Sequence, residues 1–325
     1  MFVIVHRKIF VAIALALVVG SIAVISIFGL RLGIDFAGGS LTEVAFSTTL
    51  PDKAVLEENI TNLNIGNFTV RESQDEVGRD GFLVRTRSLS ESEREALANA
   101  ALSVGEGGEV TRFTSIGPVI GQELRDKSVW AVTGVALIIV LYVAFAFSGI
   151  GKPVSSWVYG GITIFVLIHD VLLPAAMISV LGVVAGVEID VLFVMAILAV
   201  LGYSVNDTIV VFDRVRENLI QNRTERKVKT NVAGVVNEEI EYTLTKPFEE
   251  IVGSAVTQTI ARSINTSFTT LITLTALYII GGSVTQTFAL VLMVGVLAGT
   301  YSSIAMASPL LITYAKWQEG KSVKK

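Results

Sequence analysis

Long apolar segments without acidic or basic side chains dominate the chain. Such side chains are absent between Lys8 and Arg31, between Lys127 and Lys152, and from Ser263 to Ala315. A helix that crosses the hydrocarbon core of a bilayer needs about 20 predominantly apolar residues. The pattern predicts six membrane-spanning helices, at residues 9–29, 128–148, 156–181, 189–213, 263–281 and 285–314.

Basic residues mark one side of these predicted spans. Lys and Arg occur before the first span, at Lys152, in a cluster from Arg214 to Lys229 and in the tail 315–325, whereas the loops after the third and fifth spans contain neither. Because short cytoplasmic loops are enriched in Lys and Arg, we expect both termini in the cytoplasm and residues 30–127 outside it. The short break Gly281-Gly282-Ser283 predicts that the last two spans form a hairpin.

The extracytoplasmic segment 30–127 has the pattern of one small domain. In chain order it predicts a strand at 40–48, a helix at 52–63, strands near 68–70 and 82–87, a helix at 90–104 and a strand at 110–116. The second helix begins at a capping box, Ser90-x-x-Glu93. The order β-α-β-β-α-β is that of the ferredoxin-like fold. The expected fold class is therefore a polytopic α-helical membrane protein with a small α+β domain between its first two spans.

The segment 214–262 is expected to lie in the cytoplasm. Its residues 222–245 are polar and predict a loop. After Pro247, apolar side chains recur at helical spacing from Phe248 to Ile260. We therefore expect an amphipathic helix that lies on the inner membrane face and leads into the fifth span.

Composition narrows the possible functions. Hydrophobic residues make up 52% of the 325 residues and charged residues 17%, against about 25% charged residues in soluble domains. This disfavours a soluble enzyme and excludes a disordered chain. The chain has no cysteine and only two histidines, which excludes disulfides and thiolate metal sites and disfavours a histidine-rich one.

Other classes of function also lack their signals. The net charge is -4, and the sequence shows no basic surface of the kind that binds nucleic acid. Both observations argue against nucleic acid as a partner. No phosphate-binding loop and no hydrolase motif is present. We therefore expect no enzymatic activity and no cofactor, and any energy must come from a partner or an ion gradient.

One acidic residue lies well inside the predicted fourth span. Asp207 stands in a polar run with Ser204, Asn206 and Thr208. Inserting an ionisable group at this depth costs roughly 2.5–3.5 kcal/mol on insertion scales. Such a group therefore indicates a function or a specific hydrogen-bond partner. A desolvated carboxyl can bind a proton and release it when water or a cation arrives; the alternative is a hydrogen bond to a neighbouring helix. Asp213, at the end of this span, has the position of a membrane-boundary residue.

Two further charged sites leave alternatives open. Arg262 is the last charge before the long neutral segment and is either a counter-ion for Asp207 or a positive-inside anchor. His169 and Asp170 lie in the middle of the third span, where Pro174 predicts a kink or a local opening. An ion-binding role and a helix-packing role for Asp170 are equally compatible with this pattern.

Several motifs occur together along the chain, and with them the sequence resembles the SecF family of protein-export membrane proteins, within the resistance-nodulation-division superfamily. The pieces are Gly33-Ile-Asp-Phe-Ala-Gly-Gly39, Gly117-Pro-Val-Ile-Gly-Gln-Glu-Leu124, His169-Asp170, the stretch from Ser204 to Asn218, Ala261 to Thr270, Gly281-Gly282, and Gly299 to Ser303. The loop 219–246 is longer than is usual in this family. In the first motif Gly33, Asp35, Phe36, Gly38 and Gly39 are the matching residues, and its glycines also permit tight turns.

The resemblance implies a role in the Sec pathway. A member of this family pairs with SecD in the SecDF complex and acts with the SecYEG translocon, with YajC and YidC as further candidate partners. It uses the proton motive force to promote late, ATP-independent translocation of preproteins across the cytoplasmic (inner) membrane. Carried over, Asp207 and Arg262 match the proton path, to which we add Asn206, Asp213 and Asp170. The coupling ion is H⁺ or Na⁺.

Two other classes of function remain as alternatives. One is a half-transporter of another resistance-nodulation-division type that exports small molecules or lipids, although such proteins usually have twelve spans. The other is a membrane scaffold without transport activity, which would not need the buried Asp207.

Overall fold

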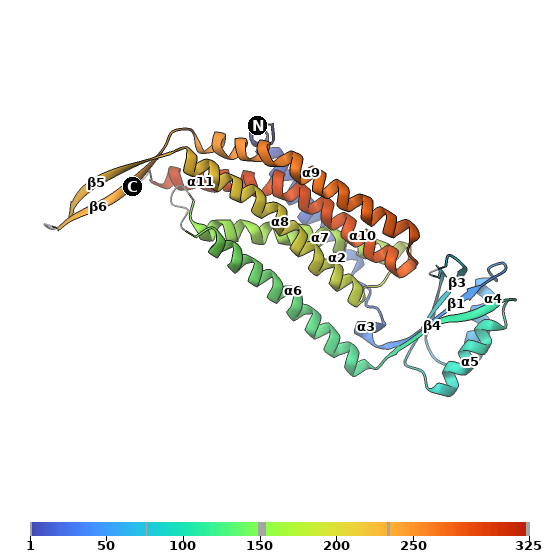
Figure 1. Ribbon diagram of the computed structural model, residues 1–325. Helices are drawn as coiled ribbons and strands as arrows, with labels where there is room; N and C mark the ends of the chain where they lie inside the picture. The colour runs from blue at the N-terminus through green and yellow to red at the C-terminus, as the bar shows by residue number, and fades with distance from the viewer. Residues whose placement is uncertain (1, 76, 149–153, 233–234, 323–325) are drawn as a thin grey trace.

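A bundle of long helices and a small sheet domain are the two parts of the molecule (Figure 1). The computed structural model describes residues 2–75, 77–148, 154–232 and 235–322. Lys152, Lys324 and Lys325, which contribute to the expected orientation, lie outside these residues.

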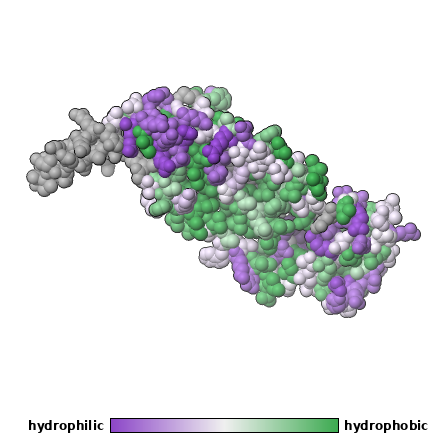
Figure 2. Space-filling model, in the orientation of Figure 1, coloured by the Kyte–Doolittle hydropathy of each residue, from purple (hydrophilic) through white to green (hydrophobic). Residues whose placement is uncertain are grey.

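Six helices in this described part are long and apolar enough to cross a membrane, which confirms the number predicted from the sequence. The short α1 (Phe2–Val5) precedes them. The spans are α2 (Arg7–Phe28), α6 (Pro118–Ala146), α7 (Ser156–Val184), α8 (Val191–Gln221), α9 (Phe248–Ile280) and a last span made of α10 (Ser283–Ser302), a π-helical turn η1 (Ser303–Ala307) and α11 (Ser308–Ser322). Figure 2 shows hydrophobic residues over the middle of the bundle and hydrophilic residues over the sheet domain and the opposite end, where both termini lie.

Helix α9 differs from the expectation at its beginning. The segment after Pro247 is not a separate helix on the membrane face; it is the first part of one continuous helix of 33 residues. Its apolar side chains Phe248, Val252 and Val256 are buried in a core shared with α8 and the last span. Glu249 also binds Arg7 at 2.9 Å and Lys316 at 2.5 Å. Burial against other helices replaces burial in lipid, so the segment stays in line with the span.

Small residues let α10 approach α8 closely. A Cβ added at Gly295 would lie 2.1 Å from Val200 Cγ2, and one at Gly299 would lie 3.1 Å from Ser204 Cβ. Both glycines therefore face α8, in the manner of small-residue contacts between membrane helices. At the other end of α10, Gly281 caps α9 and Gly282 begins α10, so the two helices form the predicted hairpin.

The sheet domain has the predicted order of elements. Strands β1 (Gly39–Phe46), β2 (Thr69–Gln74), β3 (Asp80–Thr86) and β4 (Gly108–Ile116) alternate with helices α4 (Lys53–Asn62) and α5 (Glu91–Leu102). The sheet order is β2-β3-β1-β4 with antiparallel neighbours, as in a ferredoxin-like fold. The capping box is present: Ser90 N donates to Glu93 at 2.8 Å. Arg87 and the Ser90 groups lower the pKa of Glu93 to about 2.

The segment predicted as a polar loop is a hairpin in the structure. Strands β5 (Arg223–Val232) and β6 (Val235–Leu244) pair in antiparallel fashion and project beyond the bundle (Figure 1). The missed signal is the alternation of Ile240, Tyr242 and Leu244, a strand period of two. The helix α8 also continues to Gln221, beyond the predicted end of its span.

The α8–α10 contact gives a first prediction. Replacing Gly295 with Ala places a methyl group against the stiff side chain of Val200, and overpacking of this kind costs about 1–3 kcal/mol. The unfolding temperature of the purified protein in detergent should therefore fall. The control is Gly134→Ala in α6, where a Cβ meets nothing within 4 Å and helix propensity favours Ala by up to about 1 kcal/mol. Equal melting of the two variants would contradict the close packing.

Candidate functional site

The carboxyl of Asp170 is the centre of a buried hydrogen-bond network inside the bundle. Asp170 Oδ2 accepts a hydrogen bond from Ser302 Oγ on α10 at 2.7 Å and another from Ser204 Oγ on α8. Asp170 Oδ1 lies 2.7 Å from His169 Nδ1. All four side chains are fully buried. Three helices, α7, α8 and α10, therefore converge on one carboxyl group.

His169 is the basic side chain that contacts Asp170. No Lys or Arg occurs in α2 between Lys8 and Arg31, and α7 contains no basic residue apart from His169. The ring of His169 stacks on Tyr301 with centroids 5.9 Å apart, and Tyr301 Oη donates to the Phe10 carbonyl of α2 at 2.8 Å. Within the described residues, His169 Nε2 has no hydrogen-bond partner. His169 therefore links Asp170 to the ring of Tyr301 and, through Tyr301, to α2.

Asp207 lies on the same helix face as Ser204, three residues further along α8. Its side chain is 4% exposed. Arg262 and Ser263 of α9 act on this carboxyl electrostatically. Yet the described part of the chain offers Asp207 Oδ2 no hydrogen bond, and no ion pair within 4.0 Å joins Asp207 to Arg262 there. One oxygen of a buried carboxyl is thus left without a partner.

The other predicted site residues lie at the edge of this arrangement. Asn206 is exposed on the outer side of α8, and Arg262 is exposed on α9. Asp213 is exposed too and forms an ion pair with Arg216. Helix α7 runs through Pro174 without interruption. The structure therefore brings Asp170 into contact with Ser204 of α8, one turn from Asp207, and leaves Asp213 outside the network.

Two of the apolar spans, α8 and α9, also have polar side chains on their exposed surfaces. Asn206 of α8 and Arg262, Asn265 and Thr269 of α9 are exposed on the surface of this single chain. Exposed polar side chains in hydrocarbon are costly. We call these four residues the polar face.

The motif of residues 33–39 connects α2 to the sheet domain and contacts the loop between α7 and α8. Gly33 N donates to the Ile189 carbonyl at 2.8 Å, and Ile189 N donates to the Arg31 carbonyl at 2.8 Å. Asp35, in the short helix α3 (Ile34–Ala37), accepts a hydrogen bond from Val191 N at 3.0 Å. Burial raises the pKa of Asp190, and the neighbouring Asp35 raises it further.

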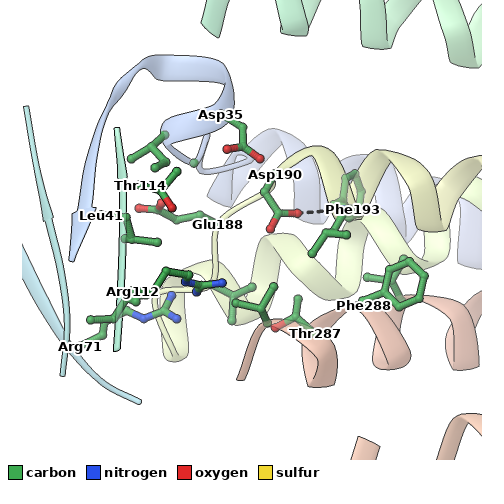
Figure 3. A pocket seen from close by; sticks show the side chains of 17 residues that line it. Asp35, Leu41, Arg71, Arg112, Thr114, Glu188, Asp190, Phe193, Thr287 and Phe288 are labelled. Atoms are coloured by element: carbon green, nitrogen blue, oxygen red, sulfur yellow. Dashed lines mark hydrogen bonds between the residues drawn. The ribbon is translucent and has the colours of Figure 1, made fainter. Parts of the chain in front are cut away.

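Arginines of the sheet hold the same loop from the other side. Arg85 donates to the Leu32 carbonyl at 3.0 Å and pairs with Glu188, while Arg71 donates to the Gly186 carbonyl. A cavity of about 210 Å³ lies between the sheet and the ends of α8 and α10. Figure 3 shows Asp35, Glu188 and Asp190 on one side of it and Arg71 and Arg112 on the other. These contacts of Arg71, Arg85 and Glu188 were not predicted from the sequence.

The described residues contain no group of three or more acidic or histidine side chains that could hold a metal ion.

Comparison with known proteins identifies relatives along nearly the whole chain. Residues 97–317 match the family model "Protein export membrane protein SecD/SecF, C-terminal", and residues 23–49 match the model "SecD/SecF GG Motif". The chain is 36% identical to a protein translocase subunit SecF of Anaerolinea thermophila, covering 97% of this chain and 93% of that protein. It is also 36% identical to a subunit of that name from Thermobaculum terrenum, with coverage of 95% and 92%.

Longer relatives contain this chain as one part. A protein translocase subunit SecDF of Thermus thermophilus is 32% identical over 91% of this chain, which covers 36% of that protein. The crystal structure of a SecDF described as a translocon-associated membrane protein matches 96% of this chain and 38% of the other, with a TM-score of 0.77 and 31% identity.

The Asp170 network gives a second prediction. Ser302→Ala removes one donor from a buried carboxyl and should destabilise the protein by about 1–2 kcal/mol, between the values of about 1.5–3 for bonds to charged groups and about 0.6 for interhelical bonds in membranes. Ser308→Ala is the matched control, because Ser308 is equally buried and its Oγ lacks a hydrogen-bond partner in the described residues. Thermal unfolding in detergent measures the difference. A loss as large in Ser308→Ala would argue against the network.

Proposed function

Because the chain belongs to the SecD/SecF family of protein-export membrane proteins, we propose that it acts as a SecF-type subunit that couples an ion gradient to protein export. It is a multi-pass membrane protein and a transport component of the Sec system rather than a catalytic enzyme. We further propose that the proton motive force drives a late, ATP-independent stage of preprotein translocation. In this proposal the protein lies in the cytoplasmic (inner) membrane, with both termini in the cytoplasm and the sheet domain outside, next to the exported chain.

The observation that carries this proposal is the Asp207 carboxyl. It is buried at membrane depth with one oxygen unpartnered in the described residues, and Arg262 is the cation whose field reaches it. A lone carboxylate in such surroundings is strongly disfavoured unless a proton or a cation binds it. The approach or withdrawal of the Arg262 guanidinium, which stays charged at any physiological pH, would then decide whether the proton remains.

Asp170 extends the ion path into the bundle. Ser204 donates to Asp170 and lies one turn from Asp207 on α8, so Asp170 contacts α8 one turn before Asp207. His169 lies 2.7 Å from Asp170 and extends this hydrogen-bonded path by one more polar group. We propose that Asn206, within the polar face, and Asp213, toward the cytoplasmic end of α8, line the outer part of this path. Serine and asparagine oxygens also suit Na⁺, which is the alternative coupling ion to H⁺.

The polar face argues for a partner within the membrane. The SecDF of Thermus thermophilus, of which this chain covers 36%, suggests SecD as that partner. We propose that SecD covers the polar face and completes the ion site, since transporter sites form at the interface between repeats. The SecYEG translocon, with YajC and YidC, and the preprotein are further proposed partners.

The third prediction concerns Asp207. Asp207→Asn keeps the shape and hydrogen-bonding capacity of the side chain but removes its titration. Folding and partner binding should survive, whereas stimulation of export by the gradient should be lost. The gradient supplies roughly 2.3 kcal/mol per charge per 100 mV. The measurement is preprotein translocation in membrane vesicles with and without an uncoupler.

Two variants accompany this experiment. Glu217→Gln changes an exposed carboxyl further along α8 and should leave the uncoupler sensitivity as it is. Arg262→Lys keeps the charge but loses the planar guanidinium, so a partial loss of stimulation is expected. Full uncoupler sensitivity in Asp207→Asn would overturn the proposed role of Asp207.

The fourth prediction tests the covered polar face. Since the chain has no cysteine, a photo-crosslinker can be attached to a single cysteine at Asn265. In cells that co-express a SecD protein, this position should yield an adduct that mass spectrometry identifies as SecD. The control position is Leu137 on α6, whose side chain is 59% exposed and apolar, and it should yield no such adduct. Equal capture from both positions would contradict a specific interface.

A further inference from the structure

Two carboxylates from distant parts of the chain hold the first turn of α8. Asp190, the residue before the helix, accepts a hydrogen bond from Phe193 N at 2.8 Å, as an N-cap residue does. Asp35, 156 positions before Val191, accepts one from Val191 N at 3.0 Å. Because α8 already has a cap of its own, the bond from Asp35 is an additional tie between the motif of residues 33–39 and the end of this helix.

Helix α8 connects this tie to the ion site. It is uninterrupted from Val191 to Gln221, and Asp207 lies 16 residues after Val191, or about 24 Å along the axis at 1.5 Å per residue. Because the helix has no break over this length, a shift of α8 that follows from the charge state of Asp207 can reach its first turn.

The connection from Asp35 to the sheet has little freedom to absorb such a shift. Only Phe36, Ala37 and Gly38 separate Asp35 from β1, which begins at Gly39. A Cβ at Gly39 would lie 2.6 Å from the Thr86 carbonyl oxygen of β3, and one at Gly38 would lie 2.9 Å from Pro118 Cα at the start of α6. Both glycines have positive φ angles, 76° and 129°, which other residues adopt at a cost. Backbone therefore packs closely on backbone at Gly38 and Gly39.

The sheet domain also holds the loop before α8 directly. Arg85 pairs with Glu188, and Arg71 donates to the Gly186 carbonyl. Both members of the Arg85–Glu188 pair are about one quarter exposed, so water can replace this contact. The loop and the first turn of α8 are thus held by the sheet domain at two places, one of them polar and exchangeable.

We propose that Asp35 is the positioning residue that transmits the movement of α8 to the sheet domain. The inference rests on the proposed function, because it takes an ion-dependent shift of α8 at Asp207 as its input. It goes beyond that function, because it names Asp35 as the mechanical link between the ion site and the sheet domain, which is proposed to contact the exported chain. If Asp35 were only a structural cap, its loss would lower stability and leave the response to Asp207 unchanged.

The test uses two spin labels on the cysteine-free chain, one at Glu58 on α4 and one at Ile280 at the end of α9, both exposed. Pulsed electron paramagnetic resonance measures the distance between them in a complex with a cysteine-free SecD. Asp207→Asn mimics the neutral acid and should shift this distance. In the Asp35→Ala background the same change should produce no shift. In the Asp35→Ala variant with Asp207 intact, gradient-stimulated export should fall about fivefold. A cap contact of about 1 kcal/mol corresponds to this factor.

Two variants separate transmission from stability. Asp35→Asn retains an oxygen that can accept from Val191 N and should restore most of the distance shift. Asp52→Ala removes a hydrogen bond of the same kind, from Ala54 N at 2.9 Å within the sheet domain, and should leave the shift intact. If Asp207→Asn moves the labels equally with and without Asp35, the coupling role is overturned while the proposed function stands. If it moves them in neither background, the proposed function fails and the coupling role with it.

Discussion

The cost of placing a carboxyl group in a membrane shapes the core of this protein. Asp170 is tolerated because hydroxyl donors from α8 and α10 and the imidazole of His169 surround it. In that arrangement α10 lies so close to α8 that a Cβ at residue 295 would collide with Val200 and one at residue 299 would press on Ser204. Helix packing, hydrogen bonding and charge balance around Asp170 therefore depend on one another, and a change in any of them affects the other two. Asp207 differs, because its surroundings are incomplete in the described residues.

Regular patterns made much of the fold predictable from the sequence. Charge-free segments of sufficient length indicated the six spans, and alternating periods together with the Ser90 capping box indicated the ferredoxin-like domain. The hairpin of β5 and β6 was missed because its polar residues outweighed the alternation of three apolar positions near its end. The path of α9 was also wrong, since a single amphipathic stripe does not tell whether lipid or another helix covers it.

The site was predictable only in its parts. Asp170 and Asp207 stand out in the sequence because acids are rare at that depth. Their surroundings do not, because the rotation of each helix decides which serines face them. Ser302 and Ser308 are both buried serines of the last span, and only Ser302 reaches the acid. The contacts of Arg71 and Arg85 join residues more than 100 positions apart, and no local pattern encodes such a pairing.

The two-glycine connection between α9 and α10 has a consequence for how the protein enters the membrane. Helix α9 is the least apolar of the six spans, and it carries Arg262 and Asn265 near its middle. Only Gly281 and Gly282 lie between the helices. No polar loop therefore follows α9 that would let it insert as a separate span before α10. During biosynthesis, the pair would have to enter the bilayer together, and the more apolar α10 would then bring its polar neighbour with it. In this way α10 would assist the insertion of α9, and the polar side chains of α9 would remain available for assembly.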